Sequence, residues 1–524
     1  MAQPLPEAVF PSPDWPTCDL DDDGSGPCQG ARVEGFARCW AHLHPEQLDV
    51  ALSRLEPWTD LHAQGTTIST ALLERILGAV RRRIGVARFD DAVFEGDADF
   101  YRSTFRTAVF ARAAFRGIAR FGGAVFHENV NFKEATFHDH AVFTGSTIRG
   151  VAMFDGAVFA VAERLGPLDA DRLVLSRATF ARRVEVEAAT LDLMCTRTRF
   201  EAGATLRLRY ACVEMGSAVF GAPSSISAAH QPFRLSSGSL EGRMREHSRH
   251  PPTGSLPPRP VPETPLMISL RGVDAADLVL TDMDLARCRF AGAHNLDKLR
   301  LEGACTFGTP PSRPQFTLGW PPMRRWARRQ VLAEECNWRA ETSKNVGWPR
   351  IPPLEIDGPY APDQLLKLNP KMDALDPKVI AALYRDLRKA QEDSKNQPGA
   401  ADSYYGEMEM RRNDRSTALS ERLILHLYWL LSGYGLRAIR ALLFLFLILL
   451  IGLAALSFYW RRFGPQPELR ACVLYAAQST VSLESKLNMP DLTFTGEAVR
   501  TAVRVLGPVL LGLALLAIRN RVKR

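Results

Sequence analysis

The chain has 524 residues, of which 46% are hydrophobic and 23% charged, so it can build the cores of several domains. Its formal charge of +7 is small for this length and by itself argues neither for nor against nucleic acid binding. Nine cysteines, mostly isolated, exclude a disulfide framework and favour a reducing compartment.

Residues 1–50 contain a group of candidate metal ligands. Cys18, Cys28, Cys39 and His42 lie close together in the sequence. Thiolates and imidazole suit tetrahedral Zn²⁺, and the final C-x₂-H has ligand-like spacing, although C-x₉-C is not a usual first pair. A segment this short, without a long apolar run, has little else to stabilise it. We predict a structural zinc site here, with ordinary reduced cysteines as the alternative.

A short aromatic repeat follows a predicted helical cap at residues 51–85. From Phe89 to Phe159 a large apolar residue recurs every five or six positions, and eleven of its fourteen occurrences have Ala two positions earlier, as in "AVFEG" and "ATFHD". Residues two apart in an extended chain point to the same side. We therefore expect the Ala and Phe of each unit to face inward and the residue between them to face outward.

In a straight strand the residues that face one side recur at every second position, so a repeat of five residues would turn successive units to opposite sides. If the chain turns a corner after each unit, four units make a coil of about 20 residues, and coils stack at the strand spacing of about 4.8 Å. The units resemble the bacterial pentapeptide-repeat proteins. This resemblance implies a mainly β fold, a right-handed quadrilateral β-helix, over residues 86–222 and in a second block at 267–308.

Residues 223–266 separate the two repeat blocks. They are rich in Ser and Pro and contain few apolar residues. Such a segment cannot bury enough surface to offset the entropy lost on ordering, so we predict a disordered insert that acts as a solvated loop. Contacts of its basic residues with phosphate or lipid are the alternative.

Residues 309–436 are predicted to form a helical neck. Two helical stretches meet at "NQPG", and we expect Tyr384 and Leu387 to pack inside a hairpin while Glu407 and Glu409 face outward. The stretch Arg324–Arg339 looks like an amphipathic helix that caps the second repeat block.

The neck continues into "ERLILHLYWLLSGYGLRAIR", where aromatic residues and arginines are mixed, so we expect this stretch to lie at the membrane surface. The sequences "YRxLR", "YYGEMEMRR" and "SGYGLR" resemble those of actinobacterial-type membrane-anchored pentapeptide-repeat proteins, which implies two C-terminal membrane spans.

Two segments are apolar enough to cross a membrane. Residues 437–462 include twenty uncharged residues, which as a helix extend about 30 Å, and residues 501–524 form the second candidate. Arginines precede the first segment and basic residues follow the second, so the positive-inside rule places both ends in the cytoplasm. We predict a multi-pass protein of the cell membrane with most of its chain cytoplasmic.

The inter-span loop, residues 463–500, contains an apolar stretch at 471–483 that is too short to cross. A re-entrant helix there would resemble the layout of the pore module of tetrameric cation channels. The corresponding sequence, "STVSLES", lacks both glycines of the TVGYG filter. An interfacial helix is the favoured alternative.

The sequence contains none of the common nucleotide-binding, metalloprotease or serine-hydrolase motifs, so we expect no enzyme and no catalytic residues.

The leading hypothesis is a membrane-anchored scaffold whose partners are membrane lipid, a cytoplasmic protein and further copies of the chain. The alternative is an ion-channel-like pore gated by the solenoid. Mimicry of DNA, known among soluble pentapeptide-repeat proteins, ranks last because residues 86–160 carry nine acidic and eight basic residues. We expect no nucleic acid partner.

Overall fold

The computed structural model describes residues 14–22, 26–233, 264–312, 326–342, 347–351, 375–463 and 494–522, with the isolated positions 240, 242, 315–316, 323–324, 470 and 473. The chain divides into two compact units. The solenoid unit comprises residues 1–309, 332–334 and 350–364. The helical unit comprises residues 310–331, 335–349 and 365–524.

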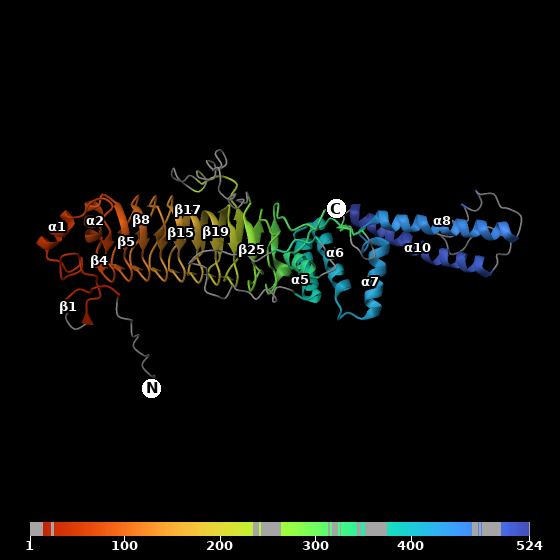
Figure 1. Cartoon of the computed structure of the whole chain (residues 1–524), viewed down its shortest axis with the longest axis horizontal. Coiled ribbons are helices and arrows are strands. Elements are labelled where there is room, and N and C mark those ends of the chain that lie inside the picture. The colour runs from red at the N-terminus through yellow and green to blue at the C-terminus, as the bar shows by residue number, and fades with distance from the viewer. Residues whose placement is uncertain are drawn as a thin grey trace, which may run out of the picture. The chain divides into compact units, whose positions relative to one another are not determined.

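The solenoid unit is built from three sheets of parallel strands, each strand pairing with its counterparts in adjacent coils (Figure 1). The 14-stranded sheet contains β3 (Leu61–His62), β5 (Arg83–Arg88), β8 (Thr104–Val109), β11 (Val125–Phe126), β12 (Val130–Asn131), β15 (Thr147–Met153), β17 (Arg164–Val174), β19 (Val184–Met194), β21 (Ala204–Arg209), β22 (Cys212–Glu214), β24 (Ser224–Ala228), β25 (Leu266–Ser269), β26 (Leu278–Thr281) and β27 (Arg300–Glu302). The 8-stranded sheet contains β4 (Thr67–Ile68), β6 (Val93–Phe94), β9 (Ala114–Phe115), β13 (Thr136–Phe137), β16 (Val158–Phe159), β18 (Thr179–Phe180), β20 (Arg199–Phe200) and β23 (Val219–Phe220). The 3-stranded sheet contains β7 (Ala98–Asp99), β10 (Ala119–Arg120) and β14 (Ala141–Val142).

The strand register gives the length of one coil. Phe94 pairs with Phe115, and Phe115 pairs in turn with Phe137 in the next coil. Further along the ladder, Phe200 pairs with Phe220. In each pair the sequence advances by four units of the repeat, so the predicted β-solenoid is confirmed. Its right-handed, quadrilateral form stays a prediction.

Phenylalanine rings fill the core in four columns. Rings one coil apart stack nearly parallel, with centroid separations of 5.2 Å for Phe89 and Phe110 and 4.7 Å for Phe94 and Phe115. The other two columns begin with Phe100 over Phe121 and Phe105 over Phe126. All these rings are buried. Each contributes roughly 1.5–3 kcal/mol through burial, so the repeat is stable without a bound ligand.

The strand ladder begins before the predicted boundary at residue 86. Strands β3 and β4 pair with β5 and β6, so residues 51–85 are not simply a helical cap. Helix α2 (Thr70–Ala79) is inserted within this first coil, and α1 (Pro45–Ser53) precedes it. The search for recurring phenylalanines did not find these strands, because Leu61 and Ile68 occupy their inward positions.

The two predicted repeat blocks form one ladder. Strand β22 pairs with β25, and β24 pairs with β26, so the coils before and after the insert are direct neighbours. Residues 224–228 form strand β24 and are therefore not disordered as predicted, because Ser224 and Ile226 take inward positions. Residues 234–239, 241 and 243–263 of the predicted insert lie outside the described residues. A 3₁₀ turn, η1 (Leu296–Lys298), precedes β27.

In the helical unit, the described residues form a helix hairpin followed by three further helices. Helix α5 (Pro377–Asp393) and helix α6 (Gln397–Asn413) meet at the "NQPG" sequence, where Asn396 caps α6 by accepting a hydrogen bond from the backbone of Gly399. A Cβ on Gly406 would lie 2.6 Å from the Tyr384 ring, so glycine permits this close approach. Strands β28 (Gln315–Phe316) and β29 (Met323–Arg324) form a separate hairpin.

The prediction for the glutamates of α6 was wrong. Glu407 and Glu409 are 5% and 3% exposed and do not face outward. Both carboxylates are paired with arginines inside the unit, which offsets the cost of burying them. The predicted helix Arg324–Arg339 is also shorter than expected, since α4 covers only Ala333–Glu341 and residues 327–330 form no regular element.

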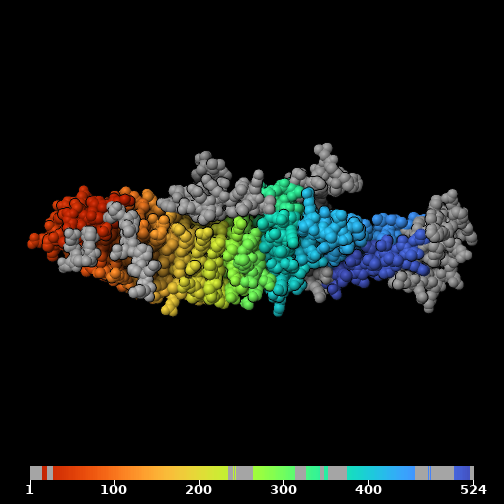
Figure 2. All heavy atoms as spheres, turned by 90° about the horizontal axis from the view of Figure 1, so that it is seen from below, coloured from red at the N-terminus to blue at the C-terminus, as the bar shows by residue number. Residues whose placement is uncertain are grey.

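The remaining helices are α7 (Leu419–Ser432), α8 (Ala438–Phe463) and α10 (Phe494–Val522). Helices α8 and α10 pack side by side (Figures 1 and 2). The buried positions of α10 are Val503, Gly507, Leu510, Ala514 and Ala517, a 4-3-4-3 spacing that forms one seam along the helix. Among the described residues, one segment, Thr501–Arg519 of α10, is long and apolar enough to cross a membrane; Ala438–Ile451 of α8 counts as a shorter apolar helix.

Candidate metal centre and buried charge network

The four predicted zinc ligands come together in the solenoid unit. The antiparallel pair β1 (Asp21–Asp22) and β2 (Gly26–Pro27) brings Cys18 and Cys28 to one end of a hairpin, where Cys28 N–H donates to the carbonyl of Leu20 at 3.1 Å. Cys39 and His42 share a turn, closed by a 3.0 Å hydrogen bond from His42 N–H to the Cys39 carbonyl. Local backbone geometry therefore places two ligands on each side of the site.

The distances among the ligand atoms fit one tetrahedral ion. Cys28 Sγ lies 3.9 Å from Cys39 Sγ, and His42 Nδ1 lies 3.6 Å from Cys18 Sγ and 3.3 Å from Cys39 Sγ. All four ligand atoms lie within 4.8 Å of one another. Zinc bonds of about 2.3 Å to sulfur and 2.0–2.1 Å to nitrogen would separate tetrahedral ligands by about 3.8 Å for S···S and 3.6 Å for S···N. The Cys₃His group can therefore hold a metal ion.

The surroundings of the ligands are those of a closed site. Cys18 and Cys39 are buried, and a Cβ on Gly30 would lie 3.0 Å from Cys39 Sγ, so the backbone approaches this thiol closely. Burial is the main cause that raises the pKa of the Cys39 thiol to about 12, and the nearby Cys28 is the second cause. Four protein ligands in a tetrahedron leave no open position, which is typical of structural rather than catalytic zinc.

The helical unit contains a buried charge network that the sequence did not reveal. Glu335 is fully buried, and its carboxylate accepts two hydrogen bonds from Arg329 Nη2 at 2.5 and 2.6 Å. It also accepts one from Arg339 Nε at 2.6 Å and one from the Tyr384 hydroxyl at 2.5 Å. Both arginines are also buried. One carboxylate thus neutralises charge from two guanidinium groups inside the protein.

A second carboxylate extends the network toward α7 and α8. Glu409 accepts hydrogen bonds from Arg339 Nη2 at 3.1 Å, Arg412 Nη2 at 3.0 Å and the Tyr434 hydroxyl at 3.2 Å. The Arg339 guanidinium carbon lies 4.7 Å from the Trp326 ring centroid. We refer to Arg329, Glu335, Arg339, Glu409 and Arg412 as the buried charge network. It joins α4, α6 and the turn between α7 and α8.

The network predicts an acid-sensitive helical unit. Burial alone would raise the pKa of Glu335, but Arg329 and Arg339 lower it from 4.5 to about 2. A carboxyl whose pKa is lower in the folded state contributes stability that is present above the unfolded pKa and is lost as pH falls through the folded value. We expect Glu335 to account for roughly 3 kcal/mol of stability lost between about pH 4.5 and pH 2.

An acid titration of tryptophan fluorescence, which reports on Trp326 and Trp348 beside Arg339, measures this loss. The Glu335→Gln variant should show a smaller change in stability over the same pH range. An identical acid dependence in the two proteins would contradict the assignment to Glu335.

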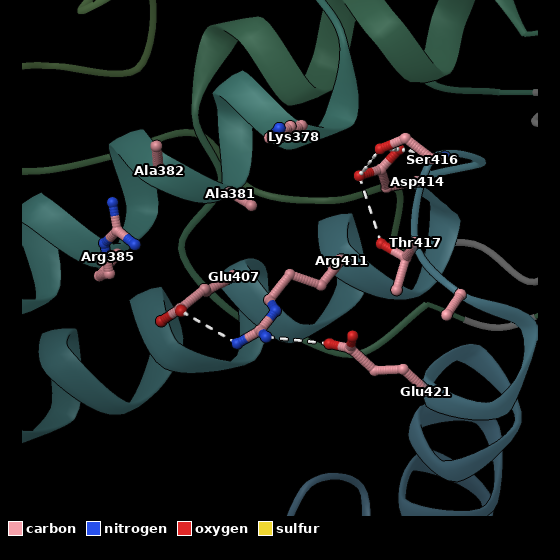
Figure 3. A pocket seen from close by; sticks show the side chains of 11 residues that line it. Lys378, Ala381, Ala382, Arg385, Glu407, Arg411, Asp414, Ser416, Thr417 and Glu421 are labelled. Carbon is pink, nitrogen blue, oxygen red and sulfur yellow. Dashed lines mark hydrogen bonds and ion pairs between the residues drawn. The ribbon is translucent and has the colours of Figure 1, made fainter.

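The helical unit also has a polar pocket of about 480 Å³ between α5, α6 and the start of α7 (Figure 3). Arg411 is paired with two of its carboxylates, contacting Glu421 at 2.9 Å and Glu407 at 3.8 Å. Asp414 accepts hydrogen bonds from the hydroxyls of Ser416 and Thr417. No histidine or cysteine is among the described residues that line this pocket, so it offers no nucleophile activated by a neighbouring imidazole.

The sequence analysis identified the metal ligands but missed the buried charge network. Arg329, Glu335 and Arg339 all fall in the stretch Arg324–Arg339, which was predicted to be an amphipathic capping helix. The available sequence signal was the pair of adjacent glutamates, Glu334 and Glu335. Glu334 accepts hydrogen bonds from the backbone N–H groups of residues 290 and 291 in the solenoid unit, at 2.6 and 3.0 Å. The predicted re-entrant stretch 471–483 lies outside the described residues except for position 473.

Comparison with known proteins supports the repeat. Residues 121–163 match the family model described as pentapeptide repeats (9 copies). The matched segment runs from Phe121 past Phe159 and includes members of all four ring columns. No curated protein and no solved structure matches the chain.

Proposed function

We propose that this pentapeptide-repeat protein is a non-enzymatic scaffold that is held at the cell membrane and binds a cytoplasmic protein through the outer surface of its solenoid. The observation that carries the proposal is the filled core. Phenylalanine rings stack along the coil with little or no exposure, so the interior leaves no room for a substrate. The outward side chains, which the core does not need for stability, are available for recognition.

One outward column is suited to binding a protein. The outward residues of the 8-stranded sheet lie in register from coil to coil. They are Thr67, Val93, Ala114, Thr136, Val158, Thr179, Arg199 and Val219, which we call the sheet column. Only one of them is charged. Val158 and Val219 are the column's most exposed apolar members, at 39% and 54%.

Several charged residues elsewhere on the coils are paired with each other. Arg112 contacts Asp91 at 2.6 Å and Arg120 contacts Asp97 at 2.8 Å, each across neighbouring coils. These pairs balance the charge of the surface and disfavour a nucleic acid partner, which requires a basic face. The sheet column remains the apolar part of the repeat surface and is the proposed protein-binding face.

Membrane attachment is supported by the exposed apolar surface of the last helices. In the segment Thr501–Arg519 only 28% of the most apolar stretch is buried, whereas a core helix of a soluble protein would be mostly buried. We propose that α8 and α10 both cross the bilayer, with Arg437 just before α8 and Arg440 in its first turn on the cytoplasmic side. The solenoid unit is then cytoplasmic, and further copies of the chain could associate through the same helices.

The Cys₃His group is proposed to hold a structural zinc ion. Cys18, Cys28, Cys39 and His42 would supply all four ligands, and the ion would stabilise a module that has a short β-hairpin and few apolar residues. The pore alternative depends on the stretch 471–483, most of which lies outside the described residues, and no contact among the described residues favours it.

We expect charge in the sheet column to abolish partner binding. Val158→Glu with Val219→Glu places two carboxylates on the proposed face without disturbing buried groups, because both side chains point outward. Affinity purification of the full chain from detergent-solubilised membranes, followed by mass spectrometry, should lose the proteins captured by the wild type. Val379→Glu, which charges an apolar residue of α5 that is 42% exposed, is the matched control. An unchanged set of captured proteins would refute recognition through this column.

A further inference from the structure

Helix α7 has two apolar sides, of which only one is covered. The covered side packs on α6 through Leu425, together with Tyr428 and Trp429, in a cluster that includes Tyr405 and Met408. The indole N–H of Trp429 donates to the Tyr405 hydroxyl at 3.2 Å. This side is therefore fixed to the neighbouring helix by packing and by a hydrogen bond.

The other side of α7 is apolar and exposed. It carries Leu419, Leu423, Ile424, Leu427 and Leu430, whose exposed fractions run from 46% to 80%. At 100° per residue these five positions fall within an arc of about 140° on the helix. A soluble helix normally presents charged and polar residues on the face away from its packing partner. This face, which we call the free face of α7, therefore needs an apolar environment.

The free face is continuous with other exposed apolar surface of the helical unit. Helix α7 contacts both α8 and α10. Ile439, Leu443 and Phe446 at the start of α8 are 58–63% exposed, and Leu515 of α10 is 58% exposed. Figure 1 shows α7 running crosswise to the paired helices α8 and α10, with α6 on one side of it and the paired helices extending away on the other.

We propose that α7 lies in the plane of the cytoplasmic bilayer surface, with its free face in the acyl chains. The inference rests on the proposed membrane anchoring by α8 and α10 and adds a second lipid-binding element to it. A helix crosswise to two spanning helices lies parallel to the membrane surface, and the face turned away from α6 is turned toward the lipid.

The flanking side chains favour a bilayer over a protein as the occupant of this face. The Arg440 guanidinium carbon lies 5.4 Å from the centroid of the half-buried Trp429 ring, so a cation and an aromatic ring lie together along one edge of α7. Arginines and tryptophan beside a strip of leucines are typical of interfacial helices, which bury their apolar face about 5–10 Å below the headgroups.

Photo-crosslinking from single positions of the full-length chain tests the proposal. The variants Leu423→p-benzoylphenylalanine and Leu427→p-benzoylphenylalanine probe the free face, in vesicles of phosphatidylcholine and phosphatidylglycerol. Leu515→p-benzoylphenylalanine probes α10, and Val379→p-benzoylphenylalanine probes an exposed apolar site on α5 that the proposal places in water. After irradiation, mass spectrometry identifies phospholipid adducts.

We expect phospholipid adducts at positions 423 and 427 in yields comparable to those at 515, and no adducts at 379. Adducts at 515 without adducts at 423 and 427 would overturn the inference while leaving the membrane anchor intact. Crosslinks from 423 and 427 to a protein, including a second copy of the chain, would also overturn it. An absence of adducts at 515 would refute the membrane anchor itself.

Discussion

Replacing Glu335 by glutamine is expected to unfold the helical unit at a markedly lower denaturant concentration than in the wild type. Glu335 is the carboxylate on which Arg329 and Arg339 converge, and all three side chains are buried. Removing its charge leaves two guanidinium groups in a region with little solvent to stabilise them. Removing one partner of a buried ion pair typically lowers the free energy of unfolding by about 3–5 kcal/mol.

The loss should be local, because the solenoid unit has its own core. Denaturation followed by tryptophan fluorescence includes the signal of Trp326, which lies against Arg339. The matched control is Glu392→Gln on α5, whose carboxylate is 52% exposed and lies 3.7 Å from Arg388. Exposed pairs of this kind contribute about 0–1 kcal/mol. Equal midpoints for Glu335→Gln and Glu392→Gln would contradict a stabilising role for the buried charge network.

Removing zinc is expected to unfold the Cys₃His module while the solenoid remains folded. Binding free energies for structural zinc sites reach about 10–16 kcal/mol at neutral pH, far more than a small module can gain from its own packing. Hydrogen exchange of residues 15–43 should therefore rise sharply on chelation.

Elemental analysis of the purified chain should find one zinc ion per chain, and Cys28→Ser should lose it. Cys305→Ser is the matched control, since Cys305 is likewise a free, partly buried cysteine but lies outside the ligand group. A purified chain without zinc, together with unchanged exchange in Cys28→Ser, would show that these residues are ordinary reduced cysteines.

The amino-acid pattern alone was sufficient to predict the repeat and the ligand group. An inward Ala and Phe in units of five or six residues leaves few ways to bury every ring, and a coil of four units satisfies all of them. The observed pairing of Phe94 with Phe115 and Phe115 with Phe137 follows from this local rule. The ligand group was likewise visible, because its chemistry depends on residue type and short spacing.

Only the tertiary structure showed where the ladder begins and that it continues past the insert. Leu61 and Ile226 fill inward positions where an aliphatic residue replaces phenylalanine, and their strands are defined by pairing with neighbouring coils rather than by their own sequence. Strand pairing across an insert depends on which edges meet in space. A one-dimensional count of phenylalanines contains no information on that.

Only the tertiary structure showed that Glu335 and Glu409 are buried. Charged residues are almost always exposed unless they are paired, so the sequence favoured the surface for both. Their partner Arg339 lies four residues from Glu335 but seventy residues from Glu409. The sequence by itself therefore determined the repeating coil and the candidate metal ligands, which depend on local spacing. The tertiary structure decided which charges are buried, because the cost of burying them is offset by partners that include side chains from distant parts of the chain, such as Tyr384 for Glu335 and Arg339 for Glu409.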